Sequence, residues 1–264
     1  MFETIRNAWK VKELRKKIFY TLAMLLVYRL AGVIPVAGID TAKVASTMQN
    51  FSLLNFMAAM TGNQFSEMTI MAMGITPYIN ASIIMQLLTV AIPYLENLQK
   101  EGEEGRKKIA QYTRYATVVL GFIQAVGLVV GMGAMKSETF GSPFITSCVI
   151  GISMAAGTAL SMWIGERITK NGVGNGISLL IFAGIIASLF KWCVSGITTL
   201  VTAFSVKALL IAILLVIGVL AMVVAVTFVN MGERRIPVAY AKRVVGRKMY
   251  GGQSTHIPLK VNSG

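Results

Sequence analysis

Long apolar runs separated by short polar segments are the dominant pattern of the sequence. Six runs are long enough to cross a hydrocarbon layer of about 30 Å, which takes roughly 20 apolar residues in a helix. They are residues 18–34, 68–93, 115–135, 145–164, 176–194 and 208–229. In the second run, Gly74 and Pro77 interrupt the helical pattern near its start. The sequence therefore predicts an all-α membrane protein of about six transmembrane helices.

Three further segments differ from these runs. Residues 1–17 place Phe2, Ile5 and Trp9 on one face of a helix whose remainder is strongly basic, a pattern typical of a helix on the cytoplasmic membrane surface. Residues 230–264 form a polar, basic cytoplasmic tail. We expect one membrane domain over residues 1–264. Residues 42–66 carry an apolar patch too short to cross a bilayer, made of Phe51, Leu53, Leu54, Phe56, Met57 and Met60.

The composition supports the membrane assignment, and the charges set its orientation. Hydrophobic residues make up 55% of the chain and charged residues only 14%, proportions that argue against a soluble fold. Of the 25 Lys and Arg, 20 lie in residues 1–17, 96–114, 165–175 and 230–264, all on one side of a six-span topology. Positive charge marks the cytoplasmic side of a membrane protein. We therefore expect both termini in the cytoplasm (N-in/C-in), with residues 96–114 as a charged loop on that side.

Few side chains in the sequence could support catalysis or metal binding. The single histidine, His256, lies in the tail, and Cys148 and Cys193 have no zinc-binding spacing. The glycine-rich string at 172–176 lacks the Lys-Ser or Lys-Thr that completes a phosphate loop. We interpret it as a tight turn in which Asn175 caps the next helix. The sequence therefore predicts neither an enzyme, nor a metal site, nor a cofactor.

Five motifs occur in order along the chain and together identify a family. They are GITPYINASIIMQLL at 74–88, KEG at 100–102 with QYTRY at 111–115, GNGIS at 174–178, YAKR at 240–243 and QSTHIPLK at 253–260. In residue type, order and spacing these strings resemble the SecY family, the channel subunits of the bacterial protein-export translocon. The resemblance extends over essentially the whole chain.

The resemblance implies a polypeptide-conducting channel in the bacterial cytoplasmic membrane. Unfolded secretory proteins would cross through it, and membrane proteins would leave it sideways into the lipid. By matching positions, Ile75, Ile79 and Ile181 would contribute to a hydrophobic pore ring. A ring of branched apolar side chains excludes hydrated ions, because a dewetted constriction is a barrier to charge. The patch within residues 42–66 falls where the family carries its plug.

The resemblance also implies a lateral gate and a set of partners. Asn80 and Ile83 would lie on the gate wall formed by the second and third spans. SecE and SecG subunits, unfolded polypeptides and membrane lipids would be partners, and the channel itself would be passive. The tail would dock the SecA motor or a ribosome through Arg234, Arg235, Lys242, Arg243, Arg247 and Lys248. The family has ten spans in two halves. We therefore expect that the sequence, which ends at Gly264, contains the first six spans and ends before the seventh.

A small-solute secondary transporter is the alternative interpretation. The number of apolar runs and the interruption of the second run permit it. Against it stands the lack of Asp, Glu or His within the runs, since a transporter of this kind needs such a group to couple an ion. A membrane enzyme is a third class, and it lacks a catalytic constellation.

Overall fold

The computed structural model describes residues 11–136, 139–202, 206–238, 243–245, 248–250 and 255–260. These residues are mostly helical, and the chain divides into two compact units, Met1–Trp192 and Cys193–Gly264. Residues 1–10 of the predicted surface helix lie outside the described residues. Lys12–Lys17 form the first turns of helix α2 (Lys12–Ala31), which continues without a break into the first apolar run.

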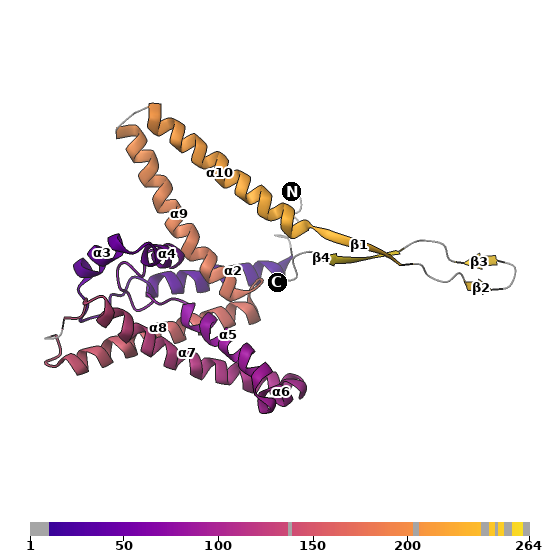
Figure 1. The fold of residues 1–264 in the computed structure, drawn as a ribbon, viewed down its shortest axis with the longest axis horizontal. Helices are drawn as coiled ribbons and strands as arrows, with labels where there is room; N and C mark the ends of the chain where they lie inside the picture. Colours follow the sequence, from indigo (N-terminus) through magenta and orange to yellow (C-terminus); the bar gives the residue numbers. More distant parts are fainter. Residues whose placement is uncertain are drawn as a thin grey trace. The chain divides into compact units, whose positions relative to one another are not determined.

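The regular elements of the first unit are all helices (Figure 1). After α2 come α3 (Thr41–Asn50), α4 (Ser52–Met60), α5 (Thr76–Ala91), α6 (Pro93–Lys100), α7 (Glu103–Gly131), α8 (Pro143–Asn171) and α9 (Gly176–Thr202), whose end belongs to the second unit. The second unit continues with α10 (Val206–Met231) and strands β1 (Glu233–Val238), β2 (Arg243–Val245), β3 (Lys248–Tyr250) and β4 (Thr255–Lys260).

Four helical stretches within the described residues are long and apolar enough to cross a membrane. They are Glu103–Gly131, Pro143–Asn171, Gly176–Thr198 and Leu209–Met231. Helices α5 and α6 together make a fifth candidate, bent by 99° between them. Helix α2 is not among these, because charged side chains occupy its first turns and Arg29 lies in its last turn. The structure thus offers four or five apolar spans, against the six that the sequence predicts.

The second predicted span, residues 68–93, is helical only from Thr76. Residues 61–75 instead form a series of buried turns, in which Met68 (φ 46°) and Gly74 (φ 52°) adopt left-handed backbone conformations that end a right-handed helix. Pro77 lies in the first turn of α5, where its missing N–H costs nothing. The interruption that Gly74 and Pro77 predict thus lies where the helix begins, and the span itself is shorter than the apolar run.

The charged segment 96–114 is largely helical rather than a loop. Only Glu101 and Gly102 separate α6 from α7. Ion pairs one turn apart support both helices there, with Lys100 2.6 Å from Glu96 and Lys107 3.3 Å from Glu103. High polarity indicated solvent exposure, but it did not exclude a helix.

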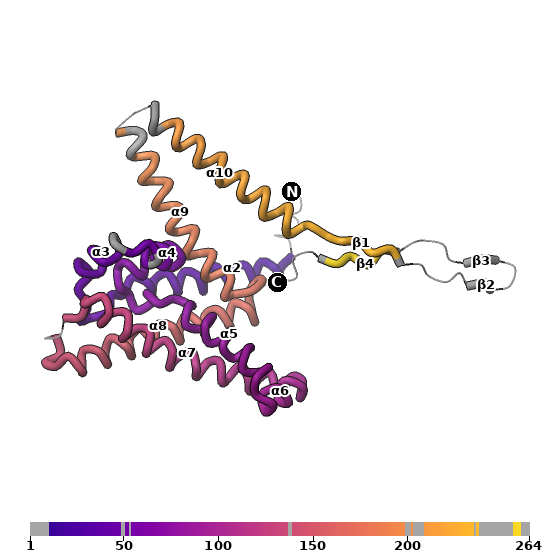
Figure 2. Tube along the Cα trace, in the orientation of Figure 1, coloured from indigo at the N-terminus to yellow at the C-terminus, as the bar shows by residue number. Residues whose placement is uncertain are grey.

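Helices α7 and α8 lie side by side and run in opposite directions (Figures 1 and 2). Small residues allow the close approach: a Cβ on Gly121 would lie 3.7 Å from Thr158, and Gly151 faces the ring of Phe122. Farther along α8, Gly157 lies against the backbone of Ile70, so the buried turns pack on this hairpin. The hairpin is the platform on which residues 61–75 rest.

The tail contains β-structure that the sequence analysis did not predict. Strands β1 and β4 pair antiparallel, with Ile236 opposite Ile257, and β2 pairs antiparallel with β3 (Figure 1). The all-α fold class is therefore corrected to mostly helical. The hairpin escaped prediction because its strands are separated by a long stretch of chain, and each contains a proline, which weakens the strand signal of a short segment.

Candidate functional site

The three isoleucines of the predicted pore ring meet around one small cavity. Ile75 lies at the start of α5, Ile79 one turn later, and Ile181 on α9. They line a cavity of about 20 Å³ whose other lining residues include Met60 and Leu180. The cavity is small, with room for about one water, because a single water needs roughly 10–15 Å³ of such space. The structure thus brings together side chains that lie about a hundred positions apart in the sequence.

The patch predicted as a plug is the short helix α4 with the residue before it. Leu54 and Met57 pack against a buried core that includes Val44, Met48 and Phe65. Phe51 and Phe56 are exposed. Met60, the last residue of α4, reaches the small cavity beside the isoleucines. The side chain of Leu53 lies outside the described residues.

A second hollow separates α4 from α9. Its volume is about 240 Å³, and Phe56, Met60, Ile185, Leu189 and Trp192 are among its lining residues. The lining is almost entirely apolar, so nothing in it fixes the orientation of a ligand. This groove leaves one side of α4 without close packing.

The two residues predicted for the lateral gate lie apart from the isoleucine cavity. Asn80 and Ile83 line a hollow of about 280 Å³ between α5 and α7, together with Leu120 and Gln124. Ile83 is half exposed. They share one face of α5, as their three-residue spacing requires.

The predicted docking cations lie in the strands of the tail. Arg234 is exposed on β1, next to Arg235, and Arg243 and Lys248 belong to β2 and β3. Lys242 and Arg247 lie outside the described residues. The described part of the set thus follows two antiparallel strand pairs rather than an irregular loop.

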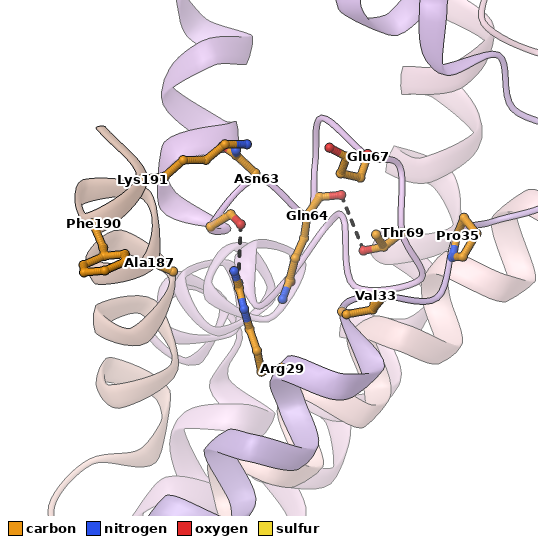
Figure 3. Close-up of a pocket in the computed structure, with 12 residues that line it drawn as sticks. Arg29, Val33, Pro35, Asn63, Gln64, Glu67, Thr69, Ala187, Phe190 and Lys191 are labelled. Carbon is orange, nitrogen blue, oxygen red and sulfur yellow. Dashed lines mark hydrogen bonds between the residues drawn. The ribbon is translucent and has the colours of Figure 1, made fainter. Parts of the chain in front are cut away.

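A larger cavity of about 580 Å³ lies between α2, the loop after α4 and α9 (Figure 3). In this view Arg29 points from α2 toward the loop, and Gln64 lies beside it. Lys191 and Phe190 belong to the α9 wall. No local sequence pattern marks these residues as a site, because they come together from three separate segments.

No cluster of His, Cys, Asp or Glu suited to a metal ion occurs among the described residues. The cavities are lined mainly by aliphatic side chains, together with amide, hydroxyl and cationic groups and the carboxylate of Glu67. Such a set can pack, exclude water and make hydrogen bonds.

Comparison with known proteins identifies the family. A family model described as SecY matches residues 69–264. The chain belongs to the SecY family. The protein translocase subunit SecY of Halalkalibacterium halodurans is 44% identical over 268 residues, covering 100% of this chain and 62% of that relative. The SecY subunit of Bacillus subtilis is 45% identical over 271 residues, and that of Escherichia coli K12 is 42% identical over 257. The chain thus spans about three-fifths of the length of its SecY relatives.

Solved structures share the fold of this SecY-family chain. "The structure of a protein conducting channel" aligns with a TM-score of 0.63 at 24% identity, covering 95% of this chain and 54% of that one. Sec61 in the canine ribosome-channel complex from the endoplasmic reticulum aligns with a TM-score of 0.59, also at 24% identity, covering 91% and 54%. At this identity the likeness concerns the fold.

Proposed function

We propose that this chain is the N-terminal part of the channel subunit of a bacterial protein translocase. In this role it conducts unfolded secretory polypeptides across the cytoplasmic membrane and releases membrane proteins sideways into the lipid. The observation that carries the proposal is the convergence of Ile75, Ile79 and Ile181 on one small cavity. Membership of the SecY family supports it, because relatives more than 40% identical are translocase subunits.

The ring works by exclusion of water. Branched aliphatic side chains make a constriction that a hydrated ion cannot enter without losing its water shell. The same side chains yield to a peptide, because van der Waals contacts with a moving chain have no fixed geometry. A seal of this kind needs no charged group and no cofactor, so the subunit is passive and not an enzyme.

Helix α4 acts as the plug of the closed channel. Its last residue, Met60, lies against the ring, while the exposed groove beside Phe56 leaves room on one side of the helix. We propose that α4 leaves this position when a polypeptide enters. The hollow between α5 and α7 at Asn80 and Ile83 is the corresponding gate wall, along which an apolar segment passes into the lipid.

The membrane arrangement follows from the distribution of charge. We propose six spans in one membrane domain, with α2 as the first span and both ends in the cytoplasm. Basic residues at the start of α2, along α6 and α7, and in the tail support this orientation. The strand pairs of the tail dock the SecA motor or a ribosome, and a ribosome complex of a structural neighbour is consistent with this. SecE, SecG and membrane lipids complete the assembly.

Site-directed crosslinking tests the function. The chain is produced in membranes together with the C-terminal part of a SecY relative, with a photoreactive residue at Ile79 and a stalled secretory precursor as substrate. We expect adducts that form only during translocation. A photoreactive residue at Leu26, 62% exposed on α2, is the matched control and should give none. Absence of adducts at Ile75, Ile79 and Ile181 would favour a solute transporter instead.

A further inference from the structure

We propose that Tyr28, Arg29 and Ser188 are positioning residues that hold Met60 against the isoleucine ring, and that the buried amide of Gln64 makes this hold weak. The inference rests on the proposed function, since it names what fixes the plug. We call these contacts the polar latch: hydrogen bonds from Tyr28 and Arg29 of α2, and from Ser188 of α9, to the C-terminal end of α4 and the loop after it.

Helix α2 supplies two contacts to the loop that follows α4. The hydroxyl of Tyr28 donates to Oε1 of Gln64 at 3.2 Å, and Nη1 of Arg29 donates to the carbonyl of Gly62 at 3.4 Å. Figure 3 shows Arg29 and Gln64 side by side in this arrangement. Tyr28 and Gln64 are 6% and 3% exposed, so water does not replace their hydrogen bond. The neighbouring residues Tyr28 and Arg29 therefore fix two points of one loop.

Helix α9 supplies the contacts on the opposite side. The hydroxyl of Ser188 donates to the carbonyl of Ala59 at 2.8 Å, one residue before Met60. One helical turn earlier, Gly184 lies against the Met60 carbonyl and within reach of Gly62, whose φ of 68° suits glycine. Two glycines thus allow direct backbone contact between α9 and the end of α4.

These contacts converge on residues 59–64, the part of the segment nearest the ring. Leu54 and Met57 hold the rest of α4 by apolar packing, which is not directional and tolerates sliding. Hydrogen bonds from two helices fix a position, because each needs a defined distance and angle. The hydrogen bonds of the latch therefore fix the position of Met60. The apolar core buries one side of α4 but does not fix its position along the neighbouring helices.

Only one of the two polar atoms in the side-chain amide of Gln64 has a hydrogen-bond partner in this arrangement: Oε1 accepts from Tyr28. Within the described residues, its Nε2 is buried and has no hydrogen-bond partner. Nε2 lies against Gly32, so close that a Cβ on Gly32 would overlap it. A side chain at position 32 therefore could not supply the missing hydrogen-bond acceptor. A buried donor without a partner destabilises the state that contains it. When the loop leaves, Gln64 gains water, and this gain favours the released state.

Cysteine accessibility tests the latch in the chain as it exists, reconstituted in lipid discs without substrate. Both native cysteines are replaced by serine, and Ala58, 5% exposed, is replaced by cysteine as the reporter of release. The reaction with a water-soluble maleimide then follows the open population. We expect Tyr28→Phe and Ser188→Ala each to raise the rate about fivefold, the effect of one hydrogen bond. Leu26→Ala, on the exposed face of α2, is the control and should leave it unchanged.

A double variant separates a latch from general loosening. Adding Gln64→Met to Tyr28→Phe removes the unpaired amide together with the stranded acceptor, so labelling should fall to or below the rate of the parent protein. A double variant that labels as fast as Tyr28→Phe alone overturns the proposal. So does an equal rise at a second reporter, Ala125→Cys on α7, since it would mean loosening of the whole unit. The labelling needs no precursor, so its outcome is independent of crosslinking at Ile79.

Discussion

The carbonyl oxygen of Met60 lies directly against Gly184, so close that a Cβ on Gly184 would overlap it. Because the obstacle is backbone, Gly184→Ala must push the end of α4 away from α9. We expect this variant to lower the free energy of unfolding by about 1–3 kcal/mol, as overpacking does. Titration with a denaturing detergent measures the change.

Gly196 on the same helix is the matched control for Gly184. A Cβ on Gly196 meets no described atom within 4 Å. Gly196→Ala should therefore be neutral or stabilising, since alanine favours the helix. Equal effects of the two substitutions would show that helix propensity, and not contact with Met60, governs position 184.

Arg114 on α7 and Glu166 on α8 form a two-pronged ion pair, with Nε and Nη2 each 2.8 Å from a carboxylate oxygen. The side chains remain 45% and 31% exposed, so screening by solvent limits the pair. A double-mutant cycle with Arg114→Gln and Glu166→Gln should give a coupling energy of about 0.5–1 kcal/mol. The coupling should shrink at high salt, and an unchanged value in 1 M salt would contradict an exposed ion pair.

Asn175 caps α9, since its side-chain oxygen accepts from the N–H of Ile177 at 3.0 Å and of Ser178 at 3.4 Å. Asn175→Ala should cost about 1 kcal/mol of stability. Asn175→Asp keeps an acceptor at the positive end of the helix and should restore most of the loss. Unfolding titrations of both variants measure these changes. If both variants lose the same free energy of unfolding, the cap is not the cause.

Arg234 is exposed on β1 and is one of the proposed docking cations. Arg234→Glu should weaken co-sedimentation of ribosomes with vesicles that carry the chain. If Arg234 contacts one phosphate, the slope of log affinity against log salt should fall by roughly one. Lys43→Glu makes the same charge change on the proposed outer side of the membrane and should have no effect. Equal losses for both would indicate nonspecific attraction.

Local sequence patterns predicted those parts of the fold that depend only on residues close together in the chain. Asn175 and the glycines around it predicted a turn and a helix cap, and the structure confirms both. Gly74 and Pro77 indicated an interruption where α5 begins, whereas the left-handed backbone at Met68 is set by packing and leaves no signal in an apolar run. Arg29 donates to the carbonyl of Gly62, 33 residues away, a contact that no local pattern around Arg29 indicates.

The sequence by itself determined that the chain is apolar, helical and a member of the SecY family, and it indicated Ile75, Ile79 and Ile181 as a set. Periodicity, capping and motif spacing are local properties, so they can be read along the chain. Only the tertiary structure decided that these isoleucines meet beside Met60, that Tyr28 reaches Gln64, and that the tail pairs into strands. Each of these depends on the distance between segments far apart in the chain, and that distance follows from the packing of the whole unit.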